Sequence, residues 1–117
     1  MSKIQLWHNQ RCSKSRDSFK LLEENNIEVD VVDYLDKKIE KEELQNILEK
    51  LSMTSARELM RTKESIYKEL KLEDENSEDI LLEMMIQHPK LIERPIIIKG
   101  NKAVIGRPIS KVMELLA

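Results

Sequence analysis

One stretch near the N-terminus combines the only cysteine of the chain with several basic residues. The apolar run Ile4–Trp7 is typical of a buried strand, and the polar segment His8–Arg16 (HNQRCSKSR) follows it. This segment places Cys12 at the start of a helical pattern. The first turn of a helix has unpartnered N–H groups and a partial positive charge, so a sulfur held there is stabilised as thiolate. Three basic side chains near the sulfur add charge of the same sign: Arg11, Lys14 and Arg16. We therefore expect a nucleophile next to an anion site.

A single cysteine excludes an intramolecular disulfide and a multi-cysteine zinc site. Lone cysteines are often small buried hydrophobes, but the charged neighbours of Cys12 favour a reactive thiol. When protonated, His8 can stabilise the thiolate, and Ser15 Oγ can donate a hydrogen bond to the sulfur. Two plainer interpretations remain open. His8 can be a strand-end histidine bonded to backbone, and Ser15 a first-turn helix residue with no chemical role.

The elements around Cys12 form a strand–helix–strand unit. The pattern predicts a helix over residues 13–26, and the β-branched run Val29–Tyr34 predicts a second strand. Strands joined by such a crossover are parallel neighbours. Active groups in these units gather where the strand ends and the helix begins, which is the position of Cys12.

The middle of the chain is helical. Residues 40–51 carry apolar side chains at helical spacing, with Ile39 able to pack on Leu44 as a hydrophobic staple. Residues 54–88 form a mainly helical insertion, in which Thr54 or Ser55, then Thr62, then Ser77 cap successive helices. The last of these helices turns Leu81, Met84 and Met85 to one side and ends at His88-Pro89.

The C-terminal part predicts a hairpin and a helix. Pro95–Lys99 and Lys102–Ile105 are strands joined by a tight turn at Gly100-Asn101. Pro108 starts the final helix, whose apolar stripe is Ile109, Val112, Met113 and Leu116.

Two arginines lie at the same end of this hairpin, because Arg94 precedes one strand and Arg107 follows the other. Like charges opposite each other destabilise a sheet, so a carboxylate or a bound anion is needed near them. Guanidinium suits a tetrahedral oxyanion because its planar fork pairs with two oxygens. For any one of these arginines, or for Arg61 between two insertion helices, a surface salt bridge is the simpler interpretation.

The segment His8–Arg16, with Arg61, Arg94-Pro95 and Arg107-Pro108, resembles the glutaredoxin-coupled arsenate reductase family, thioredoxin-fold proteins related to the Spx regulators. The resemblance runs from about residue 4 to the C-terminus. It implies a thioredoxin-like α/β fold in one domain over residues 1–117, a four-stranded mixed sheet flanked by helices with the helical insertion at about 54–88. A proline at the start of the third strand is cis in this fold, which applies to Pro95.

The resemblance also implies an activity, the reduction of arsenate to arsenite. Cys12 forms the covalent bond to arsenic, His8 and Ser15 support the thiolate, and the oxyanion is bound by arginines, namely Arg16, Arg61, Arg94 and Arg107. No cofactor is bound. Because the chain has no second cysteine, an external thiol is needed. The resemblance implies that glutathione and glutaredoxin are the external reductants.

Two other functions remain open. One is a glutathione-dependent thiol–disulfide reductase with the same Cys12 site. The other is an Spx-like regulator that binds RNA polymerase, although the second cysteine usual in Spx proteins is Ser15 here.

Composition limits the partners and the location. Lys and Arg number 20 against 22 Asp and Glu, and aromatic residues make up 3% of the 117 residues, so nothing favours binding to nucleic acid. No run has the length of a membrane span and no signal peptide is apparent. We expect a cytoplasmic monomer.

Overall fold

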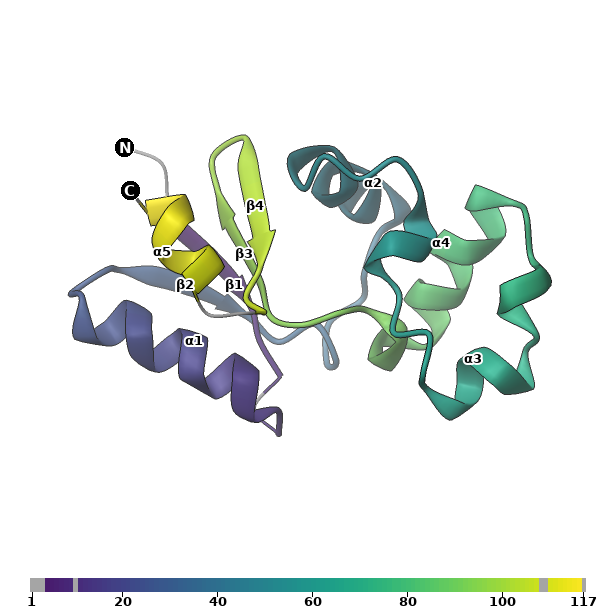
Figure 1. Ribbon diagram of the computed structural model, residues 1–117, viewed down its shortest axis with the longest axis horizontal. Coiled ribbons are helices and arrows are strands. Elements are labelled where there is room, and N and C mark those ends of the chain that lie inside the picture. The colour runs from purple at the N-terminus through teal and green to yellow at the C-terminus, as the bar shows by residue number, and fades with distance from the viewer. Residues whose placement is uncertain (1–3, 10, 108–109, 117) are drawn as a thin grey trace. The chain divides into compact units, whose positions relative to one another are not determined.

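The computed structural model describes residues 4–9, 11–107 and 110–116 (Figure 1). The chain forms two compact units, Met1–Lys37 with Arg94–Ala117, and Lys38–Glu93. The second unit therefore starts before residue 54, where the sequence analysis placed the start of the helical insertion. That the whole chain behaves as a single domain stays a prediction. Within the described residues, no helix is long and apolar enough to cross a membrane.

The first unit is built on a four-stranded mixed sheet. Its strands are β1 (Ile4–Trp7), β2 (Val29–Val32), β3 (Ile96–Lys99) and β4 (Lys102–Ile105), in the order β2-β1-β3-β4. β1 runs parallel to β2 and antiparallel to β3, and β3 and β4 pair as an antiparallel hairpin. The parallel pair and the hairpin confirm the sequence prediction, although β2 ends two residues earlier than expected and β3 begins after Pro95. Gly100 has a φ of 58° in the hairpin turn, a conformation that favours glycine.

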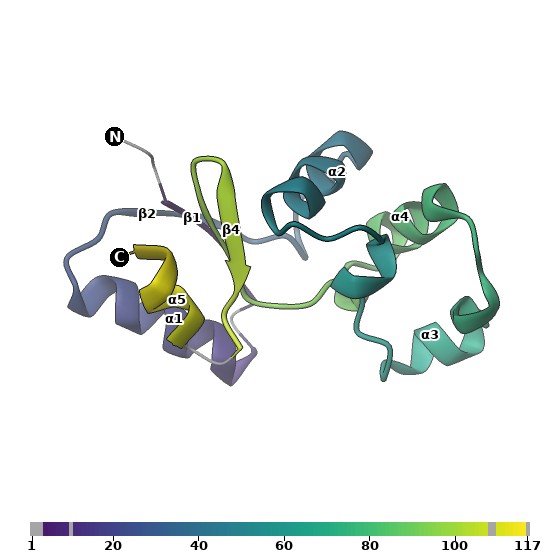
Figure 2. The same ribbon diagram turned by 45° about the horizontal axis from the view of Figure 1, so that its top comes forward.

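Two helices, α1 (Ser13–Glu24) and α5 (Ser110–Leu116), pack on one face of this sheet (Figures 1 and 2). The core between them is formed by buried aliphatic side chains from both helices and from the two strands β1 and β3, namely Ile4, Leu6, Leu22, Ile97, Val112 and Leu115. In α5 the predicted stripe is partly wrong. Met113 is 47% exposed and Leu115 is buried, because α5 faces the sheet with the i, i+3 pair Val112 and Leu115. The predicted roles of Pro108 and Ile109 fall outside the described residues.

The second unit begins with α2 (Lys41–Lys50), which confirms the helix predicted for residues 40–51. Glu40 precedes it, and the Glu40 backbone N–H donates to Glu43 Oε1 at 3.0 Å in a capping box. Ile39, Leu44 and Ile47 are buried. The acidic first turn and the apolar stripe therefore specify this helix locally.

The rest of the second unit consists of short elements: η1 (Ala56–Leu59), α3 (Ser65–Glu69), η2 (Leu72–Asp74), α4 (Glu78–Gln87) and η3 (Pro89–Leu91). Ser55 and Ser77 cap η1 and α4 as predicted, although η1 is a 3₁₀ helix. The helix predicted to start after Thr62 starts only at Ser65, because residues 61–64 form a turn in which Glu64 N–H donates to Arg61 O. In α4, Leu82 is buried with Leu81 and Met85, whereas Met84 is only half-buried.

Candidate active site

Cys12 lies directly before α1, as the loop pattern predicted. Its backbone is extended, with φ −97° and ψ 123°, and its C=O accepts the hydrogen bond of Arg16 N–H at 3.0 Å. The residue is 7% exposed. The sulfur is thus held at the positive end of a 12-residue helix, with little of the residue open to solvent.

Asn9 organises the loop before Cys12. Its side-chain Oδ1 accepts from Arg11 N–H at 3.0 Å, and its C=O accepts from Cys12 N–H at 3.0 Å. Sequence reasoning gave this residue no role. The signal was available, since asparagine accepts hydrogen bonds from the backbone two residues on in Asx turns.

Ser15 is fully buried and bonds to His8, not to the sulfur as expected. Ser15 Oγ lies 2.7 Å from His8 Nδ1 and accepts from Asn9 N–H at 2.9 Å. Ser15 therefore orients His8 and the loop backbone.

His8 is buried and is stacked on Phe19, with 5.7 Å between ring centroids. Burial lowers the pKa of His8 below its ordinary value of 6.5, Asp33 acts in the opposite direction, and Arg16 lowers the pKa further. The neutral form is therefore favoured near pH 7. This differs from the sequence expectation, which used a protonated His8, and the reason is the hydrophobic packing that the sequence pattern did not reveal.

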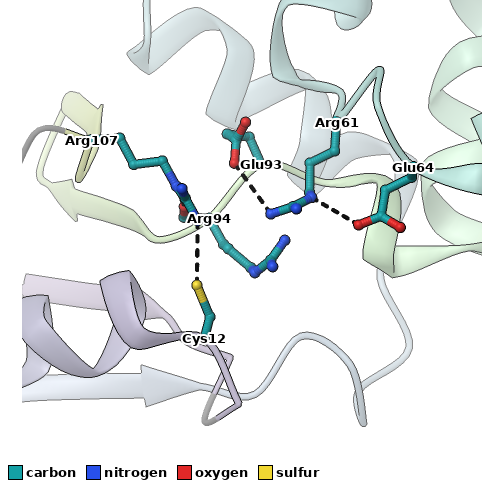
Figure 3. Close-up of polar contacts among 6 residues, drawn as sticks. All are labelled: Cys12, Arg61, Glu64, Glu93, Arg94 and Arg107. Atoms are coloured by element: carbon teal, nitrogen blue, oxygen red, sulfur yellow. Dashed lines mark hydrogen bonds and ion pairs between the residues drawn. The ribbon is translucent and has the colours of Figure 1, made fainter.

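Arg107 contacts the cysteine directly (Figure 3). Its Nη2 lies 3.3 Å from Cys12 Sγ, and its Nε donates to the C=O of Arg94 at 2.6 Å. Arg94 and Arg107 are thus neighbours at one end of the hairpin, as predicted. The guanidinium fork is held by the backbone on one side and faces the sulfur with the other.

Arg94 precedes Pro95 through a cis peptide bond, as the resemblance implied. Arg94 is half-buried, and its side chain leads away from the Arg107 guanidinium (Figure 3). The hairpin closes next to it, where Gly106 N–H donates to Pro95 O at 2.9 Å. The guanidinium groups of Arg94 and Arg107 are therefore kept apart, because the two side chains run in different directions.

Two predicted arginines have other surroundings. Arg16 is exposed on the first turn of α1. Arg61 belongs to the second unit, where its Nε lies 3.1 Å from Glu64 Oε1 and its Nη1 3.7 Å from Glu93 Oε1 (Figure 3). Oxyanion binding by either stays a prediction. Among the residues that the structure describes, no group of three or more His, Cys, Asp or Glu could hold a metal ion.

The comparisons with known proteins show the family of this chain. The model of the ArsC family matches residues 7–115, a range that includes the loop and the hairpin. The chain belongs to the ArsC family. An arsenate reductase of Neisseria meningitidis (strain Z2491) is 45% identical, with 99% of this chain and 100% of the relative covered.

Two further relatives support the family and the fold. An uncharacterised Escherichia coli K12 protein, YfgD, is 48% identical over 97% of this chain and 96% of its own length. The solved structure of an arsenate reductase from Vibrio cholerae has a TM-score of 0.93 and 42% identity, with 97% of each chain covered. The thioredoxin-like fold predicted for this ArsC chain is thereby confirmed.

Proposed function

We propose that this chain is an arsenate reductase that uses Cys12 as its nucleophile. The observation that carries the proposal is the 3.3 Å contact between Cys12 Sγ and Arg107 Nη2, which pairs a thiol with an oxyanion-binding group. Membership of a family whose relatives include proteins named arsenate reductase supports arsenate as the oxyanion.

In the first step the Cys12 thiolate attacks arsenic and displaces water from protonated arsenate, which leaves arsenic(V) bound to sulfur. Arg107 and Arg94 offset the negative charge on the arsenate oxygens in this step. By the resemblance, Arg61 and Arg16 contribute further guanidinium groups. His8 and Ser15 position the loop that holds the sulfur, through their contact with each other and the bond from Asn9 N–H to Ser15 Oγ.

The second step needs an external thiol, because this chain has one cysteine. Glutathione attacks the sulfur of the adduct. The Cys12 and glutathione sulfurs together supply two electrons, so that arsenite leaves and a Cys12–glutathione disulfide remains. Glutaredoxin then reduces this mixed disulfide and restores the thiol.

The test is arsenate-dependent oxidation of NADPH in a coupled assay with glutathione, glutaredoxin and glutathione reductase. We expect turnover in the wild type, none in Cys12→Ser, and a strong reduction in Arg94→Ala. Lys99→Ala is the matched control, because it removes a positive charge at the other end of β3. Absence of turnover in the wild type, with Cys12 still rapidly alkylated at neutral pH, would contradict the proposal and favour a thiol–disulfide reductase.

A further inference from the structure

A cavity next to the Cys12 loop has no role in the chemistry described so far. It encloses about 260 Å³ and is lined by Asn9, Arg11, Asp33, Leu35 and Asp36. All five residues belong to the first unit. One side of the cavity is the loop that leads to Cys12, and the other is the segment that follows β2.

The fold fixes both sides of this cavity. His8 N–H donates to Val32 O at 2.9 Å, which joins the start of the loop to the end of β2. After β2, Asp36 N–H donates to Asp33 O at 3.1 Å, and the buried ring of Tyr34 is stacked on Trp7 with 5.9 Å between centroids. Hydrogen bonds and ring packing therefore hold the backbone on the β2 side of the cavity and the start of the loop on the other.

The charges of the lining are mixed. Arg11 is a cation on the loop side, and Asp33 and Asp36 are anions on the other. Within the described part of the chain, no ion pair joins Arg11 to either aspartate. A ligand that carries both a carboxylate and an ammonium group satisfies both sides, whereas a simple anion is repelled by the aspartates. Leu35, 39% exposed, offers an apolar contact between these charges.

The cavity is also close to the thiol along the chain. Arg11 directly precedes Cys12, so their Cα atoms are about 3.8 Å apart. The other loop residue of the lining, Asn9, accepts the Cys12 N–H hydrogen bond at 3.0 Å. The loop side of the cavity is therefore part of the same backbone segment that holds Cys12.

We propose that this cavity binds the carboxylate and ammonium groups of a small zwitterionic peptide thiol of the glutathione class, and that it directs the sulfur of that peptide to Cys12. Arg11 pairs with a carboxylate, and Asp33 and Asp36 pair with the ammonium group. The inference rests on the proposed function in one respect, that an external thiol must meet Cys12.

The experiment uses the reduced full-length protein and glutathione disulfide, without arsenate. The Cys12 thiolate attacks one sulfur of the disulfide, a Cys12–glutathione disulfide forms, and the second glutathione leaves as a thiolate that takes up a proton. Mass spectrometry measures the rate at which the Cys12–glutathione disulfide forms. The same rate is measured with the uncharged 2-hydroxyethyl disulfide, and the ratio of the two rates removes any change in the reactivity of the thiol itself.

The expected result has a sign that general electrostatics cannot produce. Glutathione disulfide is a net anion, so removing a negative charge by Asp36→Asn would raise the ratio if only long-range repulsion mattered. If Asp36 binds the ammonium group, Asp36→Asn instead lowers the ratio about tenfold, which is the effect of losing one charged hydrogen bond. Arg11→Ala lowers it as well. Glu28→Gln makes the same charge change before β2 and leaves the ratio unchanged; Arg11, Glu28 and Asp36 are all exposed.

An unchanged or increased ratio in Asp36→Asn would overturn the assignment of the cavity. This outcome is separate from the fate of the proposed function. If arsenate is turned over but the ratio is unchanged in Asp36→Asn, the peptide-binding role of the cavity is rejected and the proposed function stands. If the ratio falls about tenfold but arsenate is not turned over, the role of the cavity is supported and arsenate is rejected as the substrate.

Discussion

Arg107 Nε donates to the carbonyl oxygen of Arg94 at 2.6 Å while Nη2 of the same guanidinium reaches Cys12 Sγ at 3.3 Å. The group that faces the sulfur is therefore positioned by the backbone at the start of the β3 segment. A side chain with one donor atom cannot make both contacts in this geometry.

Replacing Arg107 tests whether the fork, rather than the charge alone, is needed. We expect Arg107→Ala to lower kcat/KM for arsenate about 100-fold, the usual effect of losing one donor to a developing oxyanion. Arg107→Lys should recover little of this loss. Lys102→Ala, which removes a charge at the other end of β4, serves as the control in the coupled assay. Near wild-type activity of Arg107→Lys would show that charge alone is sufficient.

Ser15→Ala should destabilise the protein. The substitution removes the partner of His8 Nδ1 and of Asn9 N–H, and leaving buried polar groups unpaired costs about 1–3 kcal/mol. Urea unfolding gives the free energy. Ser13→Ala, at an exposed position of the same helix, is the control. Equal stability of both variants would contradict a structural role of the Ser15 hydroxyl.

His8 should make the stability depend on pH. Because the pKa of His8 is lowered in the folded state, the unfolded chain binds the proton more readily, and the free energy of unfolding rises with pH through this range. The contribution is fully present above the unfolded pKa of about 6.5. It is lost as the pH falls from there toward the folded pKa. Urea unfolding between pH 7.5 and 5.5 should show a smaller loss in His8→Gln than in the wild type.

Gly106→Ala should disturb the packing behind the site. A Cβ at this position would lie 2.7 Å from Ser18 Oγ, 2.8 Å from Pro95 Cγ and 3.2 Å from Ile97 Cδ1. Overpacking of this kind costs about 1–3 kcal/mol. Ser18→Ala alone should be neutral or stabilising, because the buried Oγ has no hydrogen-bond partner among the described residues. In the double variant the loss should be smaller than with Gly106→Ala alone; thermal unfolding measures all three.

Arg61 is paired with two carboxylates in its own unit, and these compete with any anion for its guanidinium. If Arg61 binds arsenate, Glu64→Gln should lower KM for arsenate about two- to fivefold, in line with a partly exposed ion pair of up to about 1 kcal/mol. Initial rates over a range of arsenate concentrations measure this. An increase in KM would show instead that Glu64 holds Arg61 in its working position.

The sequence predicted the elements whose signals are local. The Ser77 cap and the turn at Gly100 each act within a few residues, and both are present in the structure. The same holds for Cys12, because its position follows from a strand that ends and a helix that begins.

Contacts made across the fold were less predictable. Met113 and Leu115 are both apolar, and only the packing of α5 against the sheet decides which of them is buried. Ser15 can bond to a sulfur or to an imidazole, and the choice depends on where the end of β1 places His8. The cavity beside the loop needs residues from two segments and has no motif of its own.

The contact between Cys12 and Arg107 joins residues 95 positions apart. β1 likewise pairs with β3, with Ile4 opposite Lys99, although all residues of the second unit lie between these two strands in the sequence. Contacts of such long range form late in folding, since the intervening chain must first be brought together. During synthesis from the N-terminus, the thiol leaves the ribosome long before its arginine does. A nascent chain therefore carries the cysteine without its oxyanion site, and the pair exists only after residue 107 has been added and the sheet has closed.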